Sequence, residues 1–318
     1  MNEIRETPLV SVVVITYLSE KYILETLESI KAQNYQNIEL IISDDGSHDS
    51  TVLLCKQWIA DNKTRFFTTE IITVPVNTGI PSNVNRGVKA SQGEWIKYIA
   101  GDDILLPDCI SSNLNFALDN NISFLFSKPV YIDDDSEIIE DTSKLQKYND
   151  NDEFYNLNAK QQFLSLLYKR YPMSPPTCFL KKYDLDKIGW FSEEFLNEDF
   201  PLYLKVTKAG YKLYFMNKET VLYRKHATSI SSIYQNEQAI TIWEKTRLEK
   251  TIRVHITYKL FLSNPLIYID FYNRLLYSKI IIFLGNKKKV KYRLSFFRWL
   301  SPLYFKERVI IKIKKVKK

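Results

Sequence analysis

The chain has 318 residues, of which 45% are hydrophobic and 25% charged, an ordinary globular composition that allows one large domain or two smaller ones. Its three cysteines and three histidines show no paired spacing, which excludes a disulfide framework and a zinc-finger pattern and indicates a reducing compartment. The first seven residues are polar and lack the apolar core of a signal peptide, so we expect a protein that is not secreted.

Alternating strands and helices are predicted from the N-terminus onward. The β-branched run 8–17 predicts a buried parallel strand, Ser19 a helix N-cap, and the run 37–43 a second strand. That second strand ends in Asp44-Asp45-Gly46-Ser47. A strand, helix and strand in this order are typical of a nucleotide-binding half-fold.

The same alternation continues to a second acidic strand end. We predict a helix at 50–60, a strand at 67–74, a loop at Asn77-Thr78-Gly79, a helix opened by Pro81 and a strand at 94–99. Right-handed crossovers place the ends of such strands at one edge of the sheet, so Asp45, Gly79 and Asp102 should face one crevice.

Two adjacent carboxylates, Asp102 and Asp103, follow the strand at 94–99. Like charges side by side are costly unless they are solvated, cap a helix or hold a cation. The simpler alternative is a turn before a helix that starts near Pro107, and the residues alone leave both open. The acidic groups at this edge have no basic neighbour nearby in the sequence, which favours the cation.

The second half of the chain is less regular. A second acidic pair, Glu198-Asp199, precedes Pro201 and should open a helix, while a turn-like segment ends in Tyr223-Arg224-Lys225-His226. The other elements that we predict are a helix from Pro107 to 118, a strand at 122–131, a surface loop at 133–153, a helix at 158–171, an edge strand at 173–180 and two short strands within 211–223.

The C-terminal segment 287–318 is strongly basic. It holds 13 Lys and Arg and one acid, Glu307, so the rest of the chain carries a net charge of −5 against the overall +7. A solvated tail, a nucleic-acid-binding segment with interleaved aromatics, and an amphipathic helix on a membrane surface all fit this composition.

The ordered motifs together resemble the family-2 inverting glycosyltransferases of bacteria, with the GT-A fold. The resemblance covers roughly residues 8 to 231, and its six motifs are 10–17, 44–47, 77–79, 101–103, 198–199 and 223–226. It implies an α/β fold, Rossmann-like, with a mostly parallel sheet flanked by helices. We therefore expect a catalytic domain at 1–231 and a C-terminal helical, basic, membrane-associating extension at 232–318.

The resemblance assigns the donor nucleotide to the first strand ends. Thr16 and Tyr17 match residues that hold the base and ribose, and Asp45 matches the acid that hydrogen-bonds the uracil imide, with Asp44 beside it. The chain departs from the family at Arg86, which follows Asn85, whereas relatives often place the arginine before the asparagine. The full predicted donor set is Thr16, Tyr17, Asp44, Asp45, Asn77, Gly79, Arg86 and Asp102.

The resemblance assigns the reaction to the two acidic pairs. Asp103 and Asp102 match the family's metal motif, for Mn²⁺ or Mg²⁺, and His226 matches a histidine that reaches the metal or diphosphate. Asp199 matches the catalytic base, with Glu198 positioning the base or the acceptor. Many relatives carry Asp-x-Asp at the metal motif, but this chain has Ala100 at the first of those positions.

The function implied is transfer of a hexose, with glucose or galactose favoured, from a UDP-sugar to a polyprenyl-diphosphate-linked saccharide in bacterial O-antigen (lipopolysaccharide) or capsule synthesis. With this function, 287–318 is predicted to bind the anionic inner leaflet of the plasma membrane as a cytoplasmic, peripheral protein, and not nucleic acid. The alternatives are a non-catalytic module that binds nucleotide sugars or polyanions, and a nucleotidyltransferase.

Overall fold

The structure, a computed structural model, describes residues 7–141, 152–168, 173–195, 198–226, 245–246, 248–251, 262 and 265–283. The chain divides into two compact units. The first unit comprises 1–163 and 170–225 and contains all the strands listed below, and the second comprises 164–169 and 226–318.

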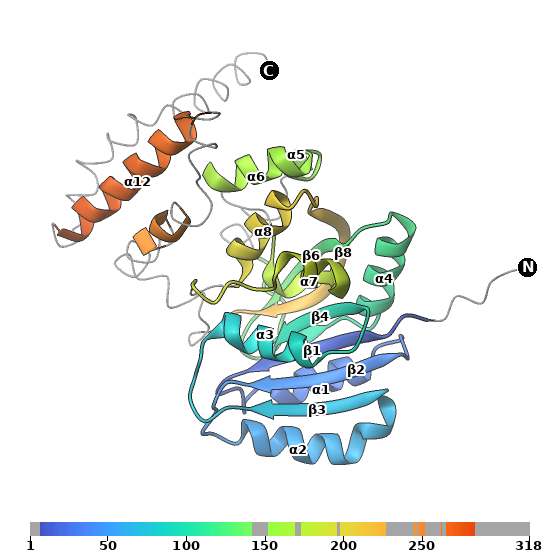
Figure 1. The fold of residues 1–318 in the computed structure, drawn as a ribbon. Helices are drawn as coiled ribbons and strands as arrows, with labels where there is room; N and C mark the ends of the chain where they lie inside the picture. The colour runs from blue at the N-terminus through green and yellow to red at the C-terminus, as the bar shows by residue number, and fades with distance from the viewer. Residues whose placement is uncertain are drawn as a thin grey trace, which may run out of the picture. The chain divides into compact units, whose positions relative to one another are not determined.

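The first unit is built on a mixed sheet with strand order β3-β2-β1-β4-β7-β6-β8-β5 (Figure 1). Strands β1 to β4 are parallel to one another, β7 runs antiparallel to β4 and β6, β8 is parallel to β6, and β5 is antiparallel to β8. The strands are β1 (Val10–Thr16), β2 (Ile38–Asp44), β3 (Thr68–Thr73), β4 (Trp95–Ala100), β5 (Ile104–Leu105), β6 (Phe124–Ile132), β7 (Phe179–Lys181) and β8 (Tyr214–Arg224).

The helices of the parallel half connect strands by crossovers, which brings the carboxyl ends of β1, β2 and β4 to one edge. Helices α1 and α2 pack on each other, and α3 packs on β1 and β2. Gly87 of α3 permits a close approach to the sheet, because a Cβ there would lie 2.3 Å from Val13 Cγ1. The helices are α1 (Ile23–Lys31), α2 (Thr51–Asn62), α3 (Ile80–Ala90), α4 (Cys109–Asp119), α5 (Asp152–Tyr155), α6 (Ala159–Tyr168), α7 (Lys182–Ile188), α8 (Asp199–Lys208) and α12 (Pro265–Phe283).

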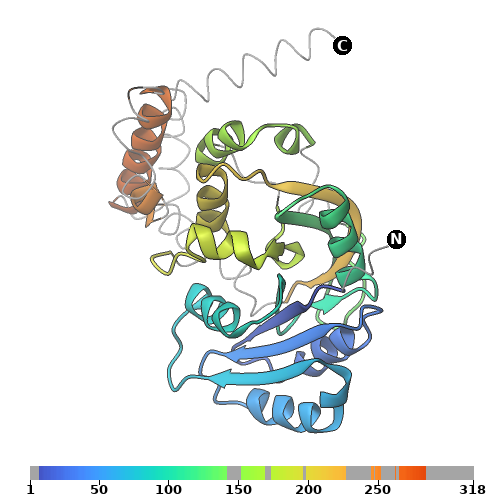
Figure 2. The same cartoon turned by 45° about the vertical axis from the view of Figure 1, so that its right-hand side comes forward.

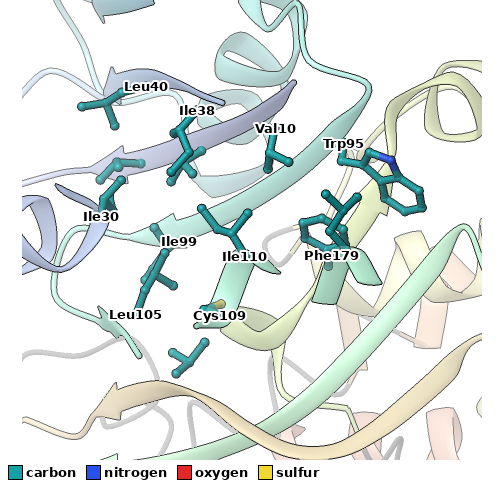
Figure 3. Packing of buried hydrophobic residues seen from close by; sticks show 14 of the residues in the cluster. Val10, Ile30, Ile38, Leu40, Trp95, Ile99, Leu105, Cys109, Ile110 and Phe179 are labelled. Carbon is teal, nitrogen blue, oxygen red and sulfur yellow. The ribbon is translucent and has the colours of Figure 1, made fainter. Parts of the chain in front are cut away.

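The hydrophobic core holds the strands in this register. Alternate residues of β1 and β2 pack against the buried face of α1 and against α4, as Figure 3 shows for Val10, Ile38 and Ile110. At the junction of the parallel and antiparallel strands, Trp95 stacks on Phe179 with ring centroids 5.2 Å apart. This packing fixes the strand ends that carry the acidic residues.

The α/β sheet with flanking helices is confirmed, and most predicted elements of the first half are found within a few residues of the expected bounds. The edge-strand prediction for 173–180 is wrong. Only Phe179–Lys181 is a strand, and it lies between β4 and β6 in the interior of the sheet. Pro175 and Pro176 instead begin a 3₁₀ turn, whose carbonyl at Pro176 accepts a hydrogen bond from the buried Lys97 ammonium.

Two further elements differ from prediction. The segment expected as two short strands is one strand, β8 (Figure 2). It pairs with β6 through register shifts between Phe126 and Lys128 and between Lys128 and Pro129. The residues directly after Asp103 form strand β5, which was not predicted, whereas the helix predicted from Pro107 to 118 is found as α4, from Cys109 to Asp119. Directly after the two aspartates the chain therefore enters the sheet, where Ile104 of β5 lies opposite Leu222 of β8.

Within the residues described, no helix has the length and hydropathy that crossing a bilayer requires. The basic segment 287–318 lies outside the described residues, so its predicted membrane helix remains a prediction.

Candidate functional site

The ends of β1 and β2 are joined through Asp44. Its Oδ2 accepts hydrogen bonds from Thr16 Oγ1 at 2.9 Å and Ser47 Oγ at 2.5 Å, and its Oδ1 accepts those of the Gly46 and Ser47 N–H groups at 3.1 and 2.9 Å. With four hydrogen bonds and almost no exposed surface, Asp44 holds the turn that follows β2. The structure thus gives Asp44 and Thr16 a positioning role at the predicted donor edge.

Asp45 ties the loop before α3 to the sheet. Its carboxylate accepts the N–H groups of Thr78 and Gly79 at 3.0 and 2.8 Å and the Thr78 hydroxyl at 2.6 Å. The Arg86 guanidinium completes the set at 2.9 Å. Burial alone would raise the pKa of Asp45, but the hydrogen bonds from Thr78, Arg86 and Gly79 outweigh it and lower the pKa.

Hydrogen bonds to residues of this cluster hold the Arg86 guanidinium in place. Besides Asp45, it donates to Asn83 Oδ1 at 3.0 Å and to Ser43 Oγ at 3.2 Å. These contacts give no support to the predicted donor-binding role of Arg86. Arg86 also supplies Asp45 with a basic partner that the nearby sequence does not contain, since the two residues lie 41 positions apart.

The predicted donor residues that face solvent are Tyr17 and Asn77. Tyr17 follows the end of β1 and is 44% exposed, which leaves its ring accessible for stacking. Asn77 is exposed, and its Oδ1 accepts the N–H of Gly79 at 3.1 Å. Gly79 has φ +90°, a conformation that glycine adopts readily, and it begins α3.

The acidic pair Asp102-Asp103 is fixed between β4 and β8. Asp103 is buried, and its Oδ1 accepts the Arg224 N–H at 2.9 Å, while the Asp102 carbonyl accepts Arg224 Nε at 2.8 Å. Burial, and then the charge of Asp102, raises the pKa of Asp103 well above its usual value, against the Arg224 N–H and the charges of Lys225 and Lys97. A carboxylate in this setting is stabilised by any cation that reaches it.

Gly101 allows this pair to lie close to the end of β1. A Cβ at that position would lie 2.8 Å from Thr16 Cγ2 and 3.2 Å from Ser19 Oγ. The carboxyl ends of β1 and β4 can therefore approach one another only because residue 101 carries no side chain.

A divalent cation fits the Asp102-Asp103 pair as a site completed by ligands from outside the protein. Carboxylate oxygens are preferred ligands of Mg²⁺ and Mn²⁺. Among the described residues there is no group of three or more His, Cys, Asp or Glu side chains that could hold a metal ion. His226 begins the second unit, so its metal role remains a prediction from the sequence.

The second acidic pair, Glu198-Asp199, opens α8 as predicted. Both carboxyl groups are buried, and Asp199 Oδ1 accepts the N–H of Phe200 at 2.6 Å. Burial, and then the charge of Asp199, raises the pKa of Glu198 to about 8. At neutral pH this pair therefore keeps a proton, which relieves the repulsion between the two carboxylates.

Charges from both acidic pairs act on Tyr223 of β8. Its pKa is raised well above the usual value by burial, and then by the charges of Asp103 and Asp102, with a contribution from Glu198. Both pairs thus lie within electrostatic range of one phenol. The structure brings together residues that are almost 100 positions apart in the sequence.

No role was predicted for Lys225 or Arg224, although both lie in the last motif. Lys225 Nζ lies 3.6 Å from the ring centroid of Tyr223. Burial lowers the pKa of Lys225 to about 8, against the charges of Asp103 and Asp102, which raise it. The two-residue period of a strand could have indicated the contact between Lys225 and Tyr223, because residues two apart in a strand point to the same face of the sheet. The buried Arg224 contacts Glu25 at 2.7 Å and so links β8 to α1.

Comparison with known proteins gives a consistent match. The sequence model for glycosyl transferase family 2 matches residues 11–189, more than half of the chain. An uncharacterized glycosyltransferase of Rickettsia typhi is 27% identical over 248 residues, which are 76% of this chain and 73% of that protein.

Solved structures with the same fold include complexes with nucleotide sugars. The mannosyltransferase PcManGT from Pyrobaculum calidifontis, in complex with GDP-Man and Mn²⁺, superposes with a TM-score of 0.57 at 15% identity, covering 95% of this chain and 83% of that one. Residues 1–349 of Staphylococcus aureus TarS, in complex with UDP-GlcNAc, superpose with a TM-score of 0.55 at 16% identity, covering 85% and 81%. These similarities show that the fold is GT-A.

Proposed function

Because the chain belongs to glycosyl transferase family 2, we propose that it transfers a hexose, glucose or galactose, from a UDP-sugar to a lipid-linked saccharide with inversion at the anomeric carbon. The observation that carries this proposal is the buried pair Glu198-Asp199, since the charges of Glu198 and of Asp102-Asp103 act on the same tyrosine, Tyr223. Asp102-Asp103 is suited to hold a cation that neutralises a leaving diphosphate, and Glu198-Asp199 is suited to accept a proton.

The donor is proposed to lie along the ends of β1, β2 and β4. Tyr17 supplies an exposed ring, and the loop at 77–79 is held in place by Asp45. Asp45 itself would reach the base only by exchanging one of its hydrogen bonds. The solved relatives contain UDP-GlcNAc in one case and GDP-Man in the other, so UDP and GDP are the nucleotides to compare.

Asp102 and Asp103 are the residues proposed to hold Mn²⁺ or Mg²⁺, with His226 as the further ligand that the sequence predicts. Such an ion neutralises the charge that develops on a diphosphate leaving group. PcManGT, with the same fold, was solved in complex with Mn²⁺.

Asp199 is proposed as the base. The acceptor hydroxyl oxygen forms a bond to the anomeric carbon, the bond from that carbon to the diphosphate oxygen breaks, and the hydroxyl proton passes to the Asp199 carboxylate. Glu198 supports this role because its raised pKa favours a neutral neighbour, and so only one negative charge on the pair.

Attachment to an anionic membrane surface is proposed for the C-terminal part, in keeping with a polyprenyl-diphosphate acceptor and a role in O-antigen or capsule synthesis on the cytoplasmic side. The basic composition of 287–318 supports the choice of anionic lipid. Helix α12 adds an exposed row of apolar side chains, Leu266, Ile269, Tyr272, Leu276 and Phe283. Their spacing of three, four or seven residues places them on one side of the helix.

The test of the catalytic proposal is Asp199→Asn, with Asp186→Asn of α7 as a control at an exposed position. We expect loss of transfer by at least about 100-fold in the first variant, because a general base is removed, with UDP binding by calorimetry almost unchanged. Transfer retained by Asp199→Asn would refute the base assignment. Transfer absent from the wild type with every donor, despite nucleotide-sugar binding, would favour the alternative of a non-catalytic binding module.

A further inference from the structure

A lysine is held beside the acidic pair at the end of β8. The N–H of Lys225 donates to the Ile132 carbonyl at 2.8 Å, which fixes its backbone against the end of β6. Its Nζ lies 3.6 Å from the ring centroid of Tyr223 and 5.6 Å from that of Tyr131. The two rings lie 5.8 Å apart and form an aromatic surface under the ammonium group.

The backbone at Lys225 is held by the same contacts that fix the acidic pair. The neighbouring residue, Arg224, donates its N–H to Asp103 Oδ1 at 2.9 Å and its Nε to the Asp102 carbonyl at 2.8 Å. Lys225 thus follows directly after the residue that binds the loop of both carboxylates. Burial lowers the pKa of Lys225 to about 8, and the charges of Asp103 and Asp102 act against that decrease. Lys128 of β6, by contrast, pairs at the surface with Glu219 at 2.9 Å.

We propose that Lys225 is a phosphate-binding residue of the donor site and the resident positive charge of the Asp102-Asp103 pair. This inference rests on the proposed function, because its ligand is a nucleoside diphosphate. Two carboxylates without a cation would repel an anionic diphosphate, and one ammonium beside them reduces that repulsion before any metal ion binds. Lysine is suited to this role, since its three donors on a flexible stem can reach phosphate oxygens.

The inference predicts nucleotide binding that is partly independent of metal. The experiment is calorimetric titration of the full chain with UDP and GDP, each in Mn²⁺ and in EDTA, and with the matching nucleosides. The variants are Lys225→Met, which keeps the length and removes the charge, and Lys225→Arg, which keeps the charge. Lys128→Met is the control for loss of a lysine charge on the adjacent strand.

We expect Lys225→Met to weaken binding of the nucleoside diphosphate in EDTA by about 10- to 100-fold, since a charge-assisted hydrogen bond is lost. Lys225→Arg should restore most of the affinity, Lys128→Met should bind as the wild type does, and nucleoside binding should be unchanged throughout.

Equal affinity of wild type and Lys225→Met for the nucleoside diphosphates, in both Mn²⁺ and EDTA, overturns the role of Lys225 but leaves the proposed function standing. An equal loss for nucleoside and nucleoside diphosphate also overturns the inference, because that result means a merely structural role. If the wild type binds neither UDP nor GDP in Mn²⁺ or in EDTA, the donor site itself is refuted, and the role of Lys225 with it.

Discussion

Replacement of Glu198 by Gln should make the protein more stable than the wild type, by an amount that grows as the pH rises. Burial, and then the charge of Asp199, moves the pKa of Glu198 from its ordinary value of 4.5 to about 8 in the folded protein. Below pH 4.5 both the folded and unfolded states are protonated at this position. Between 4.5 and 8 the unfolded state gives up its proton while the folded state keeps it, so the free energy of unfolding decreases as pH increases.

The size of the effect follows from the shift in pKa. A difference of about 3.5 units at about 1.36 kcal/mol per unit corresponds to at most about 5 kcal/mol, reached above pH 8. Because Gln does not ionise, Glu198→Gln avoids this cost. The variant should therefore gain on the wild type by up to about 1.4 kcal/mol per pH unit between these two values.

The assay is urea unfolding of wild type and variant at pH 5.5, 7.0 and 8.5. The difference at pH 5.5 combines the change in packing and hydrogen bonding with about 1.4 kcal/mol of avoided ionisation, and the increase from there to pH 8.5 measures the rest of the avoided ionisation. Glu70→Gln, at an exposed position of β3, controls for the chemical change itself. A difference that is constant over this range, or that shrinks as the pH rises, would refute the buried proton on Glu198.

Three other substitutions test the framework of the site. Arg86→Met should destabilise the protein by about 3 kcal/mol in urea unfolding, because it leaves the buried carboxylate of Asp45 without its cation. Gly101→Ala should cost about 1 to 3 kcal/mol in the same assay and weaken nucleotide binding, since its Cβ would lie 2.8 Å from Thr16 Cγ2. Leu276→Glu should reduce cosedimentation with anionic phosphatidylglycerol vesicles about tenfold or more, because it places a negative charge in the apolar row of α12.

Each of these has an outcome that counts against its reasoning. For Arg86→Met it is a cost in unfolding free energy that is equally large in the wild type and in an Asp45→Asn background. If the two residues interact, that cost should be smaller in the Asp45→Asn background. For Gly101→Ala it is unchanged stability. For α12 the control is Leu53→Glu, at an exposed leucine of α2, and equal vesicle binding by all three proteins would remove the apolar row from the membrane proposal.

The first half of the fold was predictable because each of its signals is local. The β-branched runs of β1 and β2 and the turn residues after them identify strand ends, and the alternation of strands and helices implies that these ends share an edge. Asp45, Gly79 and Asp102 could therefore be placed near one another without a structure. The opening of α8 at Asp199 was predictable for the same reason, from an acidic pair followed by a proline.

The partners of the acidic residues could not be predicted in this way. Arg86 reaches Asp45 from the second turn of a helix, and Arg224 reaches Asp103 across 121 positions, so neither pairing leaves a local pattern. The interior position of β7 depends on antiparallel bonds to both β4 and β6, which three residues after two prolines do not reveal.

The two acidic pairs deal with the same electrostatic problem in different ways. Two adjacent carboxylates in a buried place cannot both remain ionised without compensation. At Glu198-Asp199 the compensation is a proton, since the pKa of Glu198 is raised to about 8. At Asp102-Asp103 burial likewise raises the pKa of Asp103, but the Arg224 N–H and the charge of Lys225 act against that rise. Under the proposed function, the pair beside Lys225 suits the diphosphate, because a positive charge there favours an anionic ligand, and Glu198-Asp199 suits the acceptor hydroxyl.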